Sequence, residues 1–69
     1  MKYVDSSFKG QEALNEVYRL MQEEIEVWVW ADNVPTRDAI TFAHRHGWEY
    51  KYSEFYNAYG FRRTLRKHD

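Results

Sequence analysis

The clearest strand pattern in this sequence is Ile25-Glu26-Val27-Trp28-Val29-Trp30-Ala31, and the rest of the predicted fold is built around it. Successive side chains of a strand point to opposite faces of its sheet, so Val27 and Val29 share one face and Trp28 and Trp30 share the other. Both faces are therefore largely apolar, which is typical of an interior strand covered at least partly on its two sides. We expect a central strand over residues 25–31.

Apolar residues at helical spacing flank this strand and predict a helix on each side of it. The first helix runs up to Met21, and we expect Ser6-Ser7 to provide its N-cap, since a serine oxygen accepts a free backbone N–H there. The second helix opens at Pro35, with Asn33 as the expected N-cap. It ends before Gly47, because glycine readily adopts the conformation that follows a helix.

Three further strands complete the expected fold. They cover residues 2–6, 48–56 and 61–67, and a turn over residues 57–60 joins the last two as a hairpin whose final strand lies at the sheet edge. The order is β-α-β-α-β-β, and a right-handed crossover places both helices on one face. The predicted fold class is α/β, more narrowly an α+β two-layer sandwich. In it, two helices pack on one face of a four-stranded mixed sheet, as a single domain over residues 1–69.

The composition excludes several classes of protein. With 10 Lys+Arg, 11 Asp+Glu and a net charge of −1, the chain cannot hold nucleic acid by bulk charge alone. Its 43% of hydrophobic residues excludes a disordered chain, and the absence of cysteine excludes disulfides, zinc–thiolate sites and thiol chemistry. No apolar run approaches the roughly 20 residues of a spanning helix, and no signal peptide is recognised. We therefore expect no membrane association and a cytoplasmic location.

Several short motifs give the chain a resemblance to a known family. They are the strand end Trp30-Ala31-Asp32-Asn33, the helix start Pro35-Thr36-Arg37-Asp38, the stretch Gly47-Trp48-Glu49-Tyr50 and the final hairpin. In this order and spacing they resemble the TusA/SirA/YedF-like sulfur-carrier proteins, and the resemblance covers nearly the whole chain. It implies the same architecture of two helices on a four-stranded mixed sheet.

The functional motif of that family is missing. Carrier members hold a persulfide on the cysteine of a Cys-Pro-x-Pro motif at the start of the first helix, where the helix N-terminus favours the anion. Counting back from Ala31-Asp32 places Ser7-Phe8-Lys9-Gly10 over that motif, so Ser7 stands in the position of the cysteine. Because a serine hydroxyl cannot carry sulfane sulfur, the resemblance implies the fold without the activity. A divergent family member and an engineered scaffold both fit this pattern.

Three arrangements of polar residues could carry chemistry, and each has a simpler structural explanation. Ser7 could be a nucleophile, but it lacks an evident base and suits a helix cap. Asp32 and Asp38 could form an acid–base pair, but turn and helix-dipole preferences explain both. The three histidines, which could bind a metal, include two at the end of a helix, where positive charge is favoured. They are His44, His46 and His68. We expect no catalytic residue, no metal and no cofactor.

Aromatic side chains form the most informative pattern. If Val27 and Val29 meet the helices, Trp28 and Trp30 lie on the sheet face that the helices leave uncovered. Depending on strand register, other aromatic residues join them in a patch that would be unusually large for a soluble monomer. The candidate binding face is Trp28, Trp30, Tyr50, Tyr52 and Phe61, with Phe55 as an alternative member. The candidate basic contacts beside it are Arg62, Arg63, Arg66 and Lys67.

Three interpretations of this face remain open. It could bury Trp28 and Trp30 in a homodimer or against a protein partner. It could stack the bases of single-stranded nucleic acid while the basic residues hold phosphates. The faces could also be reversed, with both tryptophans in the core. The leading hypothesis is a non-catalytic binding domain, not an enzyme, that self-associates or binds a protein. Nucleic-acid binding and a scaffold without biological activity are the alternatives.

Overall fold

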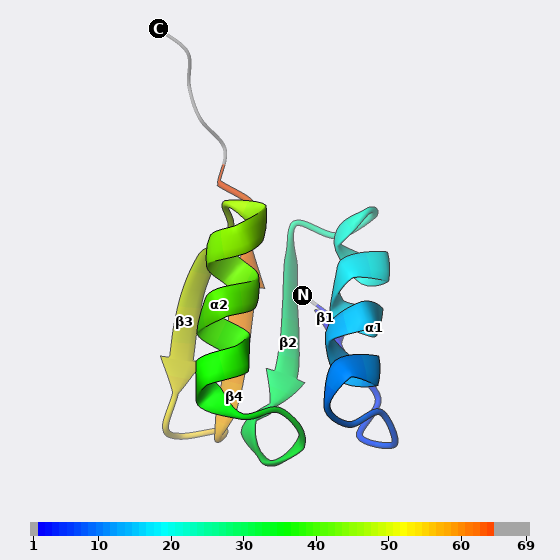
Figure 1. Ribbon diagram of the computed structural model, residues 1–69, viewed down its shortest axis with the longest axis vertical. Helices are drawn as coiled ribbons and strands as arrows, with labels where there is room; N and C mark the ends of the chain where they lie inside the picture. The colour runs from blue at the N-terminus through cyan, green and yellow to red at the C-terminus, as the bar shows by residue number, and fades with distance from the viewer. Residues whose placement is uncertain (1, 65–69) are drawn as a thin grey trace, which may run out of the picture.

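The computed structural model describes residues 2–64 and has the predicted element order (Figure 1). The strands are β1 (Lys2–Tyr3), β2 (Glu26–Trp30), β3 (Glu49–Ser53) and β4 (Ala58–Arg62). The helices are α1 (Gln11–Met21) and α2 (Thr36–His46), and a short 3-10 turn, η1 (Ala31–Asn33), follows β2. The predicted α+β two-layer sandwich with β-α-β-α-β-β order is confirmed.

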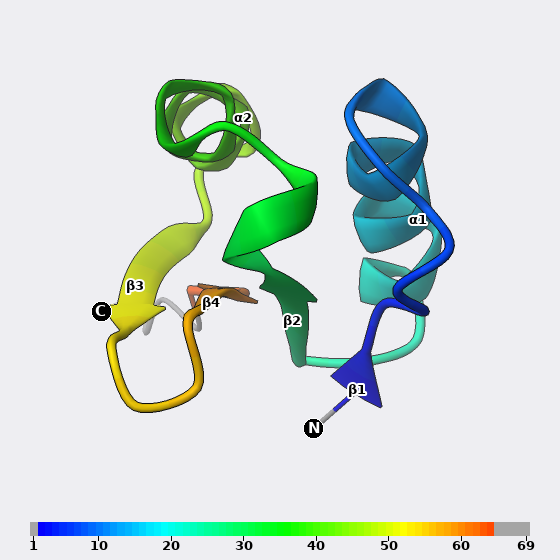
Figure 2. The same cartoon turned by 90° about the horizontal axis from the view of Figure 1, so that it is seen from below.

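The sheet is mixed, with the strand order β1-β2-β4-β3. β1 and β2 are parallel, while β4 is antiparallel to both β2 and β3. Figure 2 shows both helices on the same side of this sheet, which leaves the other side without a helix. The prediction that the final strand lies at an edge is wrong, because β4 pairs with β2 on one side and β3 on the other.

Helix α1 begins later than the sequence predicts. Its N-cap is Gly10, with φ 60°, and the Gly10 carbonyl accepts from the N–H groups of Ala13 and Leu14. The expectation that Ser6-Ser7 caps this helix is wrong, because both residues lie in a turn in which the Ser7 N–H donates to Asp5 Oδ1 at 2.9 Å. A positive φ favours glycine, which has no Cβ to clash with the backbone.

Helix α2 also begins later than predicted. Its N-cap is Pro35, and the expected cap, Asn33, instead joins two distant segments. The buried Asn33 side chain donates to the Ser6 carbonyl and accepts from Lys9 Nζ, each at 3.2 Å. Asn33 therefore fixes the loop before α1 against the end of β2. Gly47, with φ 70°, ends α2 in the left-handed conformation that the sequence predicts.

The hairpin turn lies between Ser53 and Ala58, earlier than predicted. Asn57 supplies its positive φ of 53°, which asparagine tolerates better than most residues. The residues that were expected to form the turn therefore belong largely to β4, where Gly60 pairs with both Trp28 and Lys51. The part of the predicted strand after residue 64 lies outside the described residues.

The core lies between the helices and one face of the sheet. β2 and β4 contribute Val27, Val29, Tyr59 and Phe61, and all four are almost completely buried. The helices contribute apolar side chains at three- and four-residue spacing, which are Ala13, Leu14, Val17, Leu20, Met21, Ala39, Phe42 and Ala43. Within residues 2–64, no helix is long and apolar enough to cross a membrane.

Candidate functional site

The predicted aromatic face does not form as one surface. Phe61 lies directly opposite Val27 on β2 and Tyr50 on β3, and opposed residues of neighbouring strands point to the same side. Phe61 is fully buried and packs edge-on against Phe42 of α2, with ring centroids 5.6 Å apart. It therefore belongs to the core beneath the helices. The prediction that Phe61 and Tyr50 join Trp28 is wrong.

Tyr52 lies on the helix side as well. It is opposite Tyr59, which is opposite Val29, and its hydroxyl donates to Asn57 Oδ1 at 3.0 Å. Burial raises the pKa of the nearby Tyr50 hydroxyl, and the neighbouring phenols of Tyr59 and Tyr52 raise it further. Of these tyrosines, Tyr59 is buried, Tyr50 is partly buried against the core, and Tyr52 is exposed at the β3 edge. The sequence could not place them, because a shift of one residue in register reverses the face of every side chain.

Trp28 lies on the helix-free side but is not an exposed anchor. Its ring lies over Gly60, where an added Cβ would sit 2.7 Å from two of the ring carbons. Its Nε1 donates to Glu26 Oε2 at 2.6 Å, and only 8% of the residue is exposed. The chain thus covers this tryptophan itself, without the helices and without a second molecule.

Trp30 and Tyr3 form the exposed aromatic part of the same side. Their rings stack with centroids 5.2 Å apart and an angle of 27°. Trp30 is half-buried, and Tyr3 is exposed at the β1 edge. Tyr3 was not among the predicted members, although its position in the first strand could have suggested it once β1 was paired with β2.

The hairpin loop adds two more aromatic side chains. Phe55 is 87% exposed, Tyr56 is 54% exposed, and their rings meet edge-to-face with centroids 4.8 Å apart. Figure 2 shows that this loop curls to the side of the sheet away from the helices. The Ala31 N–H donates to the Asn57 carbonyl, which holds the loop beside the end of β2 that carries Trp30. We call these residues, Tyr3, Trp28, Trp30, Phe55 and Tyr56, the helix-free aromatic face.

Charged residues of both signs share this side of the sheet. Glu26, Arg62 and Glu49 are opposed to one another across β2, β4 and β3, and Lys51 follows two positions after Glu49 on β3. Two carboxylates and two cations therefore surround the Trp28 ring. The described strands place no excess of positive charge on this side.

The candidate basic contacts do not form one cationic strip. Arg62 is exposed on the helix-free side, but Arg63 turns to the helix side and its Nη2 donates to the Met21 and Glu24 carbonyls at 2.6 and 2.7 Å. Arg63 therefore caps the C-terminal end of α1. Arg66 and Lys67 lie outside the described residues.

The other polar candidates do not converge. Ser7 is exposed in its turn, where the hydrogen bond from its N–H to Asp5 lowers the pKa of that carboxyl. Asp32 accepts from Asn57 Nδ2 at 3.2 Å, and Asp38 lies in the first turn of α2. No group of three or more possible metal ligands occurs within residues 2–64, and His68 lies outside them.

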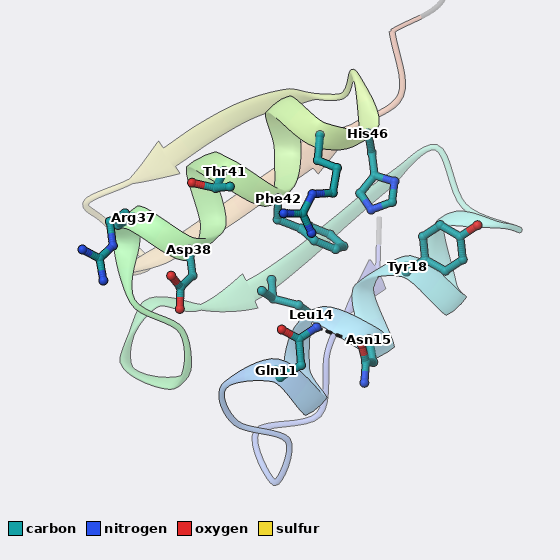
Figure 3. Close-up of a pocket in the computed structure, with 10 residues that line it drawn as sticks. Gln11, Leu14, Asn15, Tyr18, Arg37, Asp38, Thr41, Phe42 and His46 are labelled. Atoms are coloured by element: carbon teal, nitrogen blue, oxygen red, sulfur yellow. Dashed lines mark hydrogen bonds between the residues drawn. The ribbon is translucent and has the colours of Figure 1, made fainter.

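A groove that sequence reasoning missed separates the two helices (Figure 3). Its volume is about 670 Å³, and Leu14 of α1 and Phe42 of α2 form its floor. At one end, His46 stacks on Trp48 with centroids 4.7 Å apart and lies 5.1 Å from the Tyr18 ring. Leu14 and Tyr18 lie one helical turn apart in the sequence, but this spacing is equally typical of a helix face that packs in a core.

Comparisons with known proteins returned no matching family model, curated protein or solved structure. The resemblance to the sulfur carriers therefore stays a prediction that depends on the motifs alone.

Proposed function

We propose that this chain is a non-catalytic interaction domain that pairs with a second copy of itself through the helix-free aromatic face. One observation carries the proposal: Phe55, a large apolar residue, is 87% exposed on the loop that lies on this side of the sheet. Exposed apolar surface gathered on one side of a molecule is typical of an interaction site. The Trp30–Tyr3 stack extends that surface along the sheet.

The charges beside this face favour a second copy as the partner. Glu26 and Glu49 balance Lys51 and Arg62 in charge. In a dimer with a two-fold axis, the carboxylates of one copy can therefore meet the cations of the other. A partner with charge of one sign would repel either the two glutamates or the two cations. Self-pairing satisfies both signs without a change in net charge.

Pairing by the face is favoured over pairing by the edges. The edge strand β1 contains only two residues, and the other edge strand, β3, carries Glu49 and Lys51. Short edge strands and charged edge residues discourage the addition of another strand. Four strands about 4.8 Å apart make a footprint of roughly 300 Å², below the roughly 800 Å² per partner of a standard interface. We therefore expect a weak, reversible dimer.

Single-stranded nucleic acid is not favoured by the geometry. Trp28 lies flat over Gly60 and Arg63 caps α1, so two residues needed for stacking and phosphate contact are already engaged. The proposal also holds that the chain does not transfer sulfur as a persulfide, because it contains no cysteine to hold one.

Sedimentation equilibrium over a range of concentrations tests the proposal. We expect the wild type to associate reversibly and Phe55→Ser to weaken association at least about tenfold, because the most exposed apolar contact is lost. Ile40→Ser is the matched control, since Ile40 is exposed on α2 on the other side of the sheet and its removal should change nothing. A wild type that stays monomeric at high concentration contradicts self-association.

A further inference from the structure

We propose that the groove between α1 and α2 binds an acidic amphipathic helix from another protein. This groove lies on the helix side of the sheet, opposite the helix-free aromatic face, so the two surfaces can act independently (Figures 2 and 3). The inference does not depend on self-association.

The shape of the groove fits a helix. α1 contributes Gln11, Leu14 and Tyr18, which lie on one stripe over two helical turns. α2 contributes a matching stripe from Asp38 to Arg45, seven residues apart and so about 10 Å along the axis. Both helices run antiparallel to β2 and therefore run in the same direction as each other (Figure 1). The groove between them thus has two parallel walls. The apolar face of a third helix can lie between such walls.

The chemistry of the groove calls for an occupant that is apolar on one side. Leu14 and Phe42 line the floor and are 4% and 8% exposed, so they offer the groove a small apolar surface. Tyr18 and His46 close one end with aromatic surface. Gln11 and Asn15, whose side-chain amides pair at 3.0 Å, make the α1 wall polar but uncharged.

The α2 wall calls for acidic groups on the occupant. It carries Arg37 and Arg45 against the single carboxylate of Asp38. Within residues 2–64, the ion pair present joins Arg19 to Glu16, so neither groove arginine has a carboxylate partner there. The helix dipole explains Arg45 near the C-terminus of α2, but it disfavours Arg37 in the first turn. The helix dipole therefore accounts for Arg45 but not for Arg37.

A peptide fits these features better than a nucleic acid. Nucleic-acid affinity rises with the number of cations that contact phosphates, and this groove offers two arginines beside an aspartate. An amphipathic helix can place leucines on the floor and glutamates against the two arginines at the same time. Arg37 and Arg45 are eight residues apart, so acidic residues about two turns apart on the ligand match them.

The probe is a synthetic amphipathic peptide with leucine and glutamate at helical spacing, labelled for fluorescence anisotropy. We expect it to bind the wild-type chain with an affinity that falls as salt rises, while the same peptide with lysine in place of glutamate does not bind. We expect Arg45→Glu and Arg37→Glu each to raise the Kd about tenfold. Thr41→Trp, an uncharged change that fills the groove at an exposed position, should also abolish binding.

Arg62→Glu is the matched control, because it makes the same charge change on the helix-free side. It should leave peptide binding unchanged, while Arg45→Glu should leave the sedimentation of the chain unchanged. The proposal is overturned if the peptide does not bind, if Arg62→Glu weakens binding as much as Arg45→Glu, or if Thr41→Trp has no effect. Displacement of the peptide by inorganic phosphate alone, or tighter binding of a single-stranded oligonucleotide, would also overturn it. Circular dichroism confirms that each variant is folded.

Discussion

Gly60 and Trp28 show how one small residue determines the surface of the sheet. Glycine in the middle of a strand normally weakens it, because it has no side chain to pack. In this chain the indole of Trp28 fills that space, and its N–H is satisfied by Glu26. A tryptophan on the helix-free side is thereby almost completely buried. The aromatic residues that remain exposed there are Tyr3, the half-buried Trp30 and those of the hairpin loop.

We predict that Gly60→Ala destabilises the chain by about 1 to 3 kcal/mol, because the added Cβ would overlap the Trp28 ring. Urea unfolding measures the change in free energy. Replacing Trp28 by Leu in the same chain should recover part of the loss, since the smaller side chain leaves room for the Cβ. Additive effects of the two changes would contradict the contact.

Asp5 makes part of the stability dependent on pH. The hydrogen bond from the Ser7 N–H lowers the pKa of the Asp5 carboxyl below its ordinary value. A carboxyl with a lowered folded-state pKa stabilises the fold above its unfolded pKa, and this contribution is lost as pH falls through the folded value. Asp5→Ala should therefore lower the Tm slightly at pH 7, and the difference from wild type should vanish in strong acid. A difference that persists at low pH would show that charge is not the cause.

At the scale of elements, the end of α1 depends on a residue far along the chain. The last carbonyls of a helix have no partners within it. Arg63, just after β4, donates to the Met21 and Glu24 carbonyls, and its own N–H donates to the Ile25 carbonyl. The strand thereby holds both the helix end and the loop that leads into β2.

We predict that Arg63→Met destabilises the chain by about 2 to 3 kcal/mol, because buried carbonyls lose charge-assisted hydrogen bonds. Arg62→Met, one residue earlier and exposed, should change the free energy of unfolding by less than about 0.5 kcal/mol. Urea unfolding of both variants gives the comparison. Equal effects of the two substitutions would show that Arg63 does not act as a cap.

At the scale of the whole molecule, the helices divide the surface into two unlike sides. One side holds the groove with Arg37 and Arg45, and the other holds the aromatic residues with balanced charges. A domain of this size has a small core, so each side is available for binding at little cost to the other. This arrangement suits a domain that pairs with a second copy through one side and binds another protein through the other.

Self-association should also be visible in the stability of the chain. A dimer that forms only from folded monomers raises the Tm as protein concentration rises. We expect this dependence for the wild type, and we expect Phe55→Ser to remove it without lowering the Tm measured at the lowest concentration, because Phe55 is too exposed to support the monomer. Differential scanning calorimetry at several concentrations makes the measurement. A Tm independent of concentration in the wild type would argue against the dimer.

The element order, the central strand and the division into two layers could all be predicted from the sequence. Local periodicity carries this information: alternation in residues 25–31 and helical spacing in α1 and α2 are set by backbone geometry. Gly47 was predictable for the same reason, since the requirement for positive φ is local. The late start of α1 at Gln11 was missed because a serine cap and a glycine cap compete in the same short segment.

The side of the sheet that each aromatic residue occupies depends on how distant strands pair. Phe61 lies in the core, Tyr50 packs against it and Phe55 is exposed, because the hairpin turn lies at residues 54–57 and not at 57–60. Arg63 caps α1, and the Trp28 ring covers Gly60. Both contacts join segments that are far apart in the sequence, so local patterns do not predict them. A strand pattern repeats every two residues, so it specifies alternation but not register, and register depends on how the strands pair in space.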